Sequence, residues 1–195
     1  MKYVHQKVLS YLSPEMYKHK KVVDLGGRYG YIIDNLHGTQ QKVNLDINKK
    51  YLQNSRTPNK VQATLHFLPF KNHVFDLGIF TEVIEHLNNP QKAIREICRV
   101  CHNLILTTPN NSPYRKLLWK IRNKKLSSPD HKQEYSIQET ILFFKTENYK
   151  PNKLQGIGFI IHKPAKIRSQ LRRLEILPCL SSKMYIEFTE AQKND

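Results

Sequence analysis

The sequence is short of several residue types and patterns, and each shortage excludes a class of protein. Only three of the 195 residues are cysteine, too few for a disulfide framework. No apolar run approaches the roughly 20 residues of a membrane-spanning helix, so we expect no stable membrane insertion. The chain does not open on the charged-then-apolar pattern of a secretory signal peptide, so we expect a cytoplasmic protein. No repeat, linker or low-complexity block divides residues 1–195, which predicts a single domain.

Acidic residues are scarce relative to basic ones. Asp and Glu number 16 against 32 Lys and Arg, which gives a formal net charge of +16. An excess of this size favours anionic partners such as nucleic acid, phosphorylated substrates or acidic surfaces. The alternative is a solvated basic surface without such a partner.

Two of the three cysteines, Cys98 and Cys101, form a C-x-x-C pair. This spacing is found in metal and redox sites, but no second pair and no nearby pair of histidines completes a zinc site. Both cysteines lie on a helical pattern, so we expect them to pack into the interior, and we predict no metal site.

Glycine is also sparse, yet three of the seven glycines, Gly26, Gly27 and Gly30, stand close together. They follow a short apolar stretch that ends at Asp24. Apolar or aromatic residues then recur at positions 29, 32, 33 and 36, the spacing of one helix face. This order predicts strand, tight turn and helix, which is the ligand-binding corner of an open α/β sheet. Glycine suits such a turn because it adopts positive φ and lets a ligand approach the backbone.

The turn excludes two common ligands and favours a third. A dinucleotide fingerprint would need glycine where the chain has Arg28 and Tyr31, and a P-loop would need a following Gly-Lys-Ser/Thr. An acid directly ahead of the glycines is a poor neighbour for a pyrophosphate but a good one for a cation. S-adenosylmethionine carries an ammonium and a sulfonium group, so Asp24 suits it on charge grounds.

Three stretches carry a resemblance to class I S-adenosylmethionine-dependent methyltransferases. DLGGRYG, residues 24–30, resembles the D-L-G-x-G-x-G first motif, with Arg28 in place of the usual middle glycine. LHFLPFKNHVFDLGIF, residues 65–80, resembles the family's Leu-Pro-Phe turn and fourth strand. EVIEHL, residues 82–87, matches the motif after that strand almost letter for letter. The resemblance is strong over about residues 20–110 and looser elsewhere.

Alternating strand and helix patterns favour an α/β fold with a mostly parallel sheet and helices on both faces. The resemblance implies a Rossmann-like sheet of seven strands with the last strand antiparallel. We expect the strands near residues 21–24, 42–46, 60–64, 74–80, 103–108, 154–162 and 184–189. We also expect a leading helix interrupted at Pro14, a helix opened by Asn89 and Pro90, a capping box at Ser136 and Glu139, and a basic helix over 166–177.

The resemblance also implies a set of cofactor-binding residues. Asp46 closes the second strand, where a carboxylate can accept from both ribose hydroxyls; a helix N-cap is the alternative. Thr64 stands where the family usually has an Asp that accepts from the adenine amino group, and a neutral acceptor is weaker. The residues that we assign to the cofactor, S-adenosylmethionine, are Asp24, Gly26, Gly27, Gly30, Asp46, Ile47, Thr64, Leu65, Phe80, Thr81 and Glu82.

Three residues are candidates to take a proton from a hydroxyl or amine acceptor: His86, His131 and Tyr135. His86 belongs to EVIEHL, and a structural role for it is equally open. His131 and Tyr135 resemble a His-x-x-x-Tyr element of the family. They end a basic, lid-like segment at about 110–135 in which aromatic residues interleave with Lys and Arg, suited to an anionic substrate. A solvated helix with one buried face is the alternative.

The sequence thus predicts an S-adenosylmethionine-dependent methyltransferase that acts on an unidentified anionic acceptor. A small or lipid-linked acceptor is favoured over RNA, because the chain has no room for a separate nucleic-acid domain. The alternative is a non-catalytic, basic nucleic-acid-binding protein on a degenerate methyltransferase scaffold, which Arg28 and Thr64 would favour. The sequence makes no prediction about oligomeric state.

Overall fold

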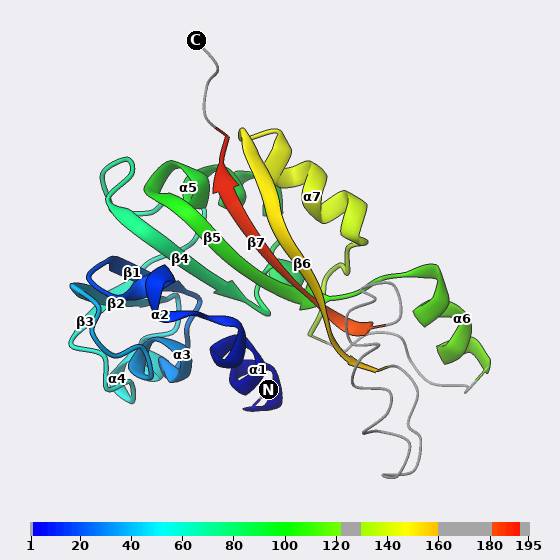
Figure 1. The fold of residues 1–195 in the computed structure, drawn as a ribbon, viewed down its shortest axis with the longest axis horizontal. Helices are drawn as coiled ribbons and strands as arrows, with labels where there is room; N and C mark the ends of the chain where they lie inside the picture. The colour runs from blue at the N-terminus through cyan, green and yellow to red at the C-terminus, as the bar shows by residue number, and fades with distance from the viewer. Residues whose placement is uncertain (1, 122–129, 160–180, 192–195) are drawn as a thin grey trace.

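The computed structural model describes residues 2–121, 130–159 and 181–191, and within them seven strands form one sheet (Figure 1). The strand order is β3-β2-β1-β4-β5-β7-β6. The five strands β1 to β5 pair in parallel, and β7 is antiparallel to both of its neighbours. The predicted Rossmann-like fold with an antiparallel last strand is therefore confirmed. The strands are β1 Lys21–Leu25, β2 Gln41–Asp46, β3 Asn59–Gln62, β4 Phe75–Thr81, β5 Cys101–Pro109, β6 Tyr149–Phe159 and β7 Ser181–Glu190.

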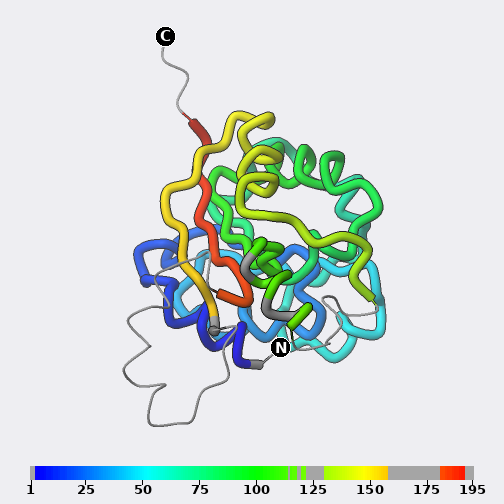
Figure 2. The backbone as a smooth tube through the Cα atoms, turned by 90° about the vertical axis from the view of Figure 1, so that its right-hand side faces the viewer, coloured from blue at the N-terminus to red at the C-terminus, as the bar shows by residue number. Residues whose placement is uncertain are grey.

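Helices pack on both faces of the sheet, so successive strand residues enter two different cores. Val22 of β1 packs with α1 and α3, whereas Val23 packs in the core shared by α5 and α7. Figure 2 shows α5 and α7 gathered on one side of the β6–β7 pair. The helices are α1 Lys2–Tyr11, α2 Pro14–Tyr17, α3 Tyr31–Asp34, α4 Lys49–Gln53, η1 Ile84–His86 (a 3₁₀ turn), α5 Pro90–Val100, α6 Pro113–Ile121 and α7 Ile137–Lys145.

Local sequence signals set several helix boundaries. The side chain of Asn89 accepts from the Lys92 N–H and Pro90 begins α5, as predicted. Ser136 and Glu139 form a complete capping box at the start of α7. Both cysteines are free thiols buried in the core, as predicted, but only Cys98 lies in α5, because Cys101 begins β5.

The helix after the glycine turn and the strand β6 differ from the sequence prediction. The helix after the glycine turn, α3, is short, and Leu36 is buried beyond its end. Strand β6 begins at Tyr149 rather than Leu154 and contains Pro151. The proline is tolerated because β6 is an edge strand whose register shifts between Pro151 and Lys153. The predicted basic helix at 166–177 lies outside the described residues.

Sheet order fixes where a ligand can bind. The chain leaves β1 toward β2 on one side and returns to β4 on the other, so the crossovers diverge between β1 and β4. In open α/β sheets the crevice at this switch point, beyond the carboxyl ends of the strands, is the usual ligand site.

Candidate active site

A cavity of about 590 Å³ lies at the carboxyl ends of β1, β2 and β4. Its size is within the range of small-molecule and cofactor sites. It brings together most of the residues predicted to bind the cofactor and one predicted catalytic residue. These are Asp24, Gly26, Gly27, Asp46, Ile47, Thr64, Leu65, Thr81, Glu82 and His86. Gly30, Phe80, His131 and Tyr135 are not among its lining residues.

The glycine turn after β1 has conformations and contacts that a side chain would disturb. Gly26 has a φ of 78° and Gly30 a φ of 75°. A Cβ atom added to Gly27 would lie 2.4 Å from Asn44 Oδ1, and one on Gly30 would lie 2.5 Å from Ser55 Oγ. Gly30 therefore faces Ser55 in the segment between α4 and β3 and does not line the cavity.

Arg28 adopts the left-handed backbone conformation at the position of the family's middle glycine. Its φ is 50°. Its backbone N–H donates to Asp46 Oδ2 at 3.0 Å, and its guanidinium donates to the Tyr51 hydroxyl at 3.0 Å and lies over the Tyr51 ring. The side chain thus follows the cavity wall toward α4, and the turn keeps the shape that a glycine would give it.

Asp46 is held in place by two backbone N–H groups. Its Oδ1 accepts from Asn48 N at 2.8 Å, and its Oδ2 accepts from Arg28 N at 3.0 Å. Each carboxylate oxygen can accept a second hydrogen bond, so both retain capacity for a ligand. The N-cap of α4 is Asn48, whose side chain accepts from Lys50 N. The alternative reading of Asp46 as a helix N-cap is therefore wrong.

Asp24 is a desolvated carboxyl in the cavity wall, only 2% exposed. Burial raises its pKa to about 7; an N–H from Ile33 opposes this rise, and the charges of Asp34 and Asp46 add to it. Because burial removes hydration from the ionised carboxylate, a cationic ligand would stabilise that charged form strongly.

Thr64 is oriented as a hydrogen-bond acceptor. His66 Nε2 lies 3.1 Å from the Asn89 carbonyl oxygen, which can only accept, so Nε2 carries the proton in neutral His66. His66 Nδ1 is then an acceptor, and it lies 3.1 Å from Thr64 Oγ1. The Thr64 hydroxyl donates to His66 Nδ1 and accepts from the His66 backbone N–H at 3.4 Å, which leaves one oxygen lone pair for a donor in the cavity.

His86 also lines the cavity, and one of its imidazole nitrogens is available as an acceptor. Its Nδ1 lies 2.9 Å from the Asp130 carbonyl oxygen, so Nδ1 carries the proton in neutral His86 and Nε2 is the basic atom. Nearby Glu82 has a φ of 55° and accepts from Thr107 Oγ1 at 3.1 Å. Its second carboxylate oxygen contacts Lys183 Nζ of β7.

The other two predicted catalytic residues, His131 and Tyr135, do not line the cavity. His131 Nδ1 is 2.8 Å from Glu134 Oε1, and its ring is 5.0 Å from that of His86 in an edge-on arrangement. Tyr135 is buried in the core beside Phe143, and burial raises its pKa. His131 therefore packs against the His86 ring without lining the cavity itself, whereas Tyr135 does not reach the cavity.

One residue of the basic segment proves to be internal. Arg115 is buried, and both terminal nitrogens of its guanidinium donate to Glu134. Its charge is neutralised inside the protein and does not belong to a cationic surface. The segment nevertheless brings a cation to the cavity, because Lys132 lines it beside Asn88.

Several lining residues carry no sequence motif. His5 of α1 stacks on Tyr31 with ring centroids 5.4 Å apart, and both line the cavity with Tyr51 of α4. The one sequence signal for His5 is its place beside Val4 and Val8, which are buried. That pattern shows a packed helix but not which ligand site its flank borders.

Residues 23–103 match the family described as "Methyltransferase domain". The sheet order, the glycine turn and the acid closing β2 agree with that match. These findings support a class I S-adenosylmethionine-dependent methyltransferase family for this chain, with S-adenosylmethionine as its cofactor. No curated protein sequence matches the chain.

Several solved structures share the fold of this chain at low sequence identity. One contains the Haloferax volcanii Trm112 methyltransferase activator in complex with a protein proposed to be a methyltransferase: TM-score 0.72, 15% identity, 99% of this chain and 91% of that chain covered. A second is an S-adenosylmethionine-dependent methyltransferase from Mesorhizobium loti. Its TM-score is 0.67 and its sequence identity 15%, and the match covers 94% of this chain and 96% of that chain. A third is YcgJ from Bacillus subtilis. Its TM-score is 0.69 and its sequence identity 16%, and the match covers 98% of this chain and 100% of that chain.

The hydrogen-bonding and charged groups of the cavity fit S-adenosylmethionine. Asp24 is a buried carboxyl suited to a cation, Asp46 has acceptor capacity left on both oxygens, and Thr64 offers a further acceptor. Ile47 is 70% exposed at the same cavity, an apolar surface for a flat ring. Within the described residues, no helix is both long and apolar enough to cross a membrane.

Proposed function

We propose that this methyltransferase transfers a methyl group to a hydroxyl or amine of a small or lipid-linked anionic acceptor, with His86 as general base. The observation that carries the proposal is the orientation of His86. The Asp130 carbonyl fixes the proton on Nδ1, and the ring lines the cavity, so Nε2 is the basic atom available to an acceptor.

Four residues would hold the cofactor. Asp24 would accept from its ammonium group, Asp46 from the ribose hydroxyls and Thr64 from the adenine edge, with Ile47 against the ring. When bound, S-adenosylmethionine supplies a methyl group on a sulfonium that is already a good leaving group. The chain's own residues therefore have to align the acceptor and take its proton, and alignment can contribute several kcal/mol.

The acceptor side of the cavity supports an anionic substrate. Lys132 is exposed at the cavity beside His86, and its backbone N–H donates to the Glu85 carbonyl at 2.9 Å, which fixes the segment against η1. A cation next to the proposed base would attract a phosphate or carboxylate of the acceptor. His131, held by Glu134, packs against His86 and positions it.

The alternative of a non-catalytic nucleic-acid binder rests on Arg28 and Thr64, the two departures from the family pattern. Arg28 keeps the shape of the turn and holds Asp46 through its backbone, and Thr64 remains an acceptor. These observations favour the catalytic proposal. Steeply salt-dependent binding of bulk RNA without cofactor binding would favour the alternative.

The test separates chemistry from cofactor binding. S-adenosylhomocysteine release would be measured with a panel of phosphorylated and carboxylated hydroxyl or amine compounds. We expect His86→Asn to lower turnover by about 100-fold or more, with cofactor affinity unchanged. Tyr135→Phe is the matched control and should retain the parent rate, because Tyr135 does not line the cavity. An active His86→Asn variant would refute the assignment of the base.

A further inference from the structure

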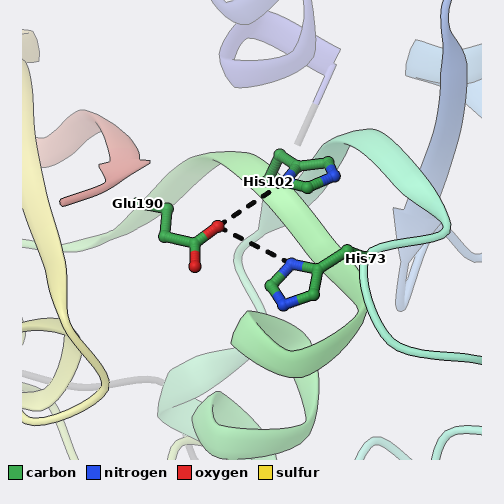
Figure 3. Close-up of side chains that lie close together, drawn as sticks. All are labelled: His73, His102 and Glu190. Atoms are coloured by element: carbon green, nitrogen blue, oxygen red, sulfur yellow. Dashed lines mark ion pairs between the residues drawn. The ribbon is translucent and has the colours of Figure 1, made fainter. Parts of the chain in front are cut away.

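Three side chains of types that bind metal ions lie together at the end of the strands opposite the cavity (Figure 3). His73 belongs to the loop before β4, His102 to the start of β5 and Glu190 to the end of β7. Because β7 runs antiparallel to β5, its last residue meets the first residues of β5. The cluster therefore lies at the amino ends of β4 and β5, whereas the cavity lies at the carboxyl ends.

The distances within the cluster suit a bound ion better than hydrogen bonds. Glu190 Oε2 lies 3.6 Å from His73 Nδ1 and 3.5 Å from His102 Nδ1. A charged hydrogen bond between such atoms would be about 2.7–2.9 Å long. Two ligand atoms, each about 2.0–2.2 Å from a tetrahedral zinc ion, are about 3.4 Å apart. We propose that His73, His102 and Glu190 bind a divalent transition-metal ion, zinc in the first instance, with water completing the coordination.

The type and exposure of the ligands agree with this proposal. Two imidazoles and a carboxylate suit zinc, nickel or copper, whereas magnesium and calcium prefer oxygen ligands alone. The side chains of His73, His102 and Glu190 are 41%, 46% and 42% exposed, so an ion can enter from solvent. The two imidazoles stack with centroids 4.8 Å apart and an interplanar angle of 25°.

The backbone beneath the ligands is held by specific contacts. His73 has a φ of 51°, an uncommon conformation, and its N–H donates to the Arg99 carbonyl at 2.8 Å. Asn103, next to His102, pairs in the sheet with Thr189, next to Glu190, and their side chains share a 2.6 Å hydrogen bond. Because the rings are nearly parallel, at least one imidazole would turn about its side-chain torsions to direct its nitrogen at the ion, and the bound ion would join the loop, β5 and β7.

This proposal departs from the sequence prediction that the chain has no metal site. That prediction considered the cysteine pair, and both cysteines are buried in the core. The three ligands here come from distant positions, so no spacing motif reveals them. A second group of Glu85, His86 and His131 also has ligand atoms close together, so a test has to separate the two.

The experiment uses the full chain without an affinity tag, stripped with a chelator and titrated with zinc chloride by calorimetry. We expect one equivalent to bind and a saturating concentration to raise the melting temperature by about 5 °C or more. His73→Ala/His102→Ala should weaken binding by at least tenfold and abolish the thermal shift. The matched control, His86→Ala/His131→Ala, should retain both. Magnesium chloride should give neither binding nor a shift.

Because the two imidazoles are exposed, the double variant should fold, with a metal-free melting temperature close to that of the parent. The visible spectrum of the cobalt-loaded protein provides a second readout, since tetrahedral cobalt absorbs more strongly than octahedral cobalt. Zinc binding that survives in His73→Ala/His102→Ala, or that is lost only in the control, would overturn the proposal. So would an absence of saturable zinc binding to the parent.

Discussion

The substitution Asp24→Asn tests the role of the carboxyl group that precedes the glycine turn. Burial raises the pKa of Asp24 to about 7, so the group is mostly protonated at pH 6 and mostly ionised above pH 7. A cationic ligand binds the ionised form, and binding must displace the proton at low pH. With a pKa of about 7, the ionised fraction is roughly 0.1 at pH 6 and 0.75 at pH 7.5. We therefore expect affinity for S-adenosylmethionine to rise about eightfold over this range.

The same shift acts on stability with the opposite sign. A carboxyl whose pKa is raised in the folded state holds its proton where the unfolded chain has lost it, so this group's stabilising contribution falls as pH rises from about 4 to about 7. Cofactor binding should reverse part of that loss. Asp24→Asn should remove both pH dependences while retaining the side-chain shape.

The assay is isothermal titration at pH 6, 6.5, 7 and 7.5, in two buffers of different ionisation enthalpy. The parent should release protons at pH 6, which appears as a buffer-dependent heat, and Asp24→Asn should release fewer. Titration of the ligand's own amino group is common to both proteins and cancels in the comparison. An affinity profile that is flat in the parent, or equally steep in the variant, would refute the assignment of Asp24.

Three further changes test other contacts of the account. Asp46→Ala should weaken cofactor binding by about tenfold or more, as measured by calorimetry, with little change in melting temperature; unchanged affinity would remove the ribose assignment. Arg28→Gly should keep cofactor affinity within about tenfold of the parent, because glycine accepts the left-handed φ; a gain of several hundredfold would mean that Arg28 obstructs the site. Glu134→Ala should cost about 3–5 kcal/mol in urea unfolding, because it leaves Arg115 buried without its carboxylate, and a loss below about 1 kcal/mol would contradict the buried pair.

Local signals predict most of the strands and several helix starts, whereas the seven-stranded, mostly parallel sheet follows from the family resemblance. The glycine turn, the acid closing β2 and the EVIEHL motif are short segments whose conformation depends on neighbouring residues, so sequence patterns reveal them. Asn89 and Ser136 cap their helices through side-chain contacts within three residues. The boundaries of β6 were harder to predict, because its pairing with β7 overrides the effect of Pro151.

The parts of the site that sequence could not predict depend on distant segments. His5 reaches the cavity because α1 packs over α3, and Thr64 is oriented by His66, which is itself held by the Asn89 carbonyl. Tyr135 was grouped with His86 and His131 from a motif, yet the fold directs it into the core beside Phe143. Sequence spacing gives no information about such contacts between segments.

The most direct measurement is a calorimetric titration of the purified chain with S-adenosylhomocysteine at pH 7.5. This ligand keeps the ammonium, ribose and adenine groups that Asp24, Asp46 and Thr64 are assigned to hold, and it cannot react. The account predicts saturable binding at one site per chain, weakened in Asp46→Ala. An absence of binding by the folded parent protein would contradict the account of the cavity as a working methyltransferase site.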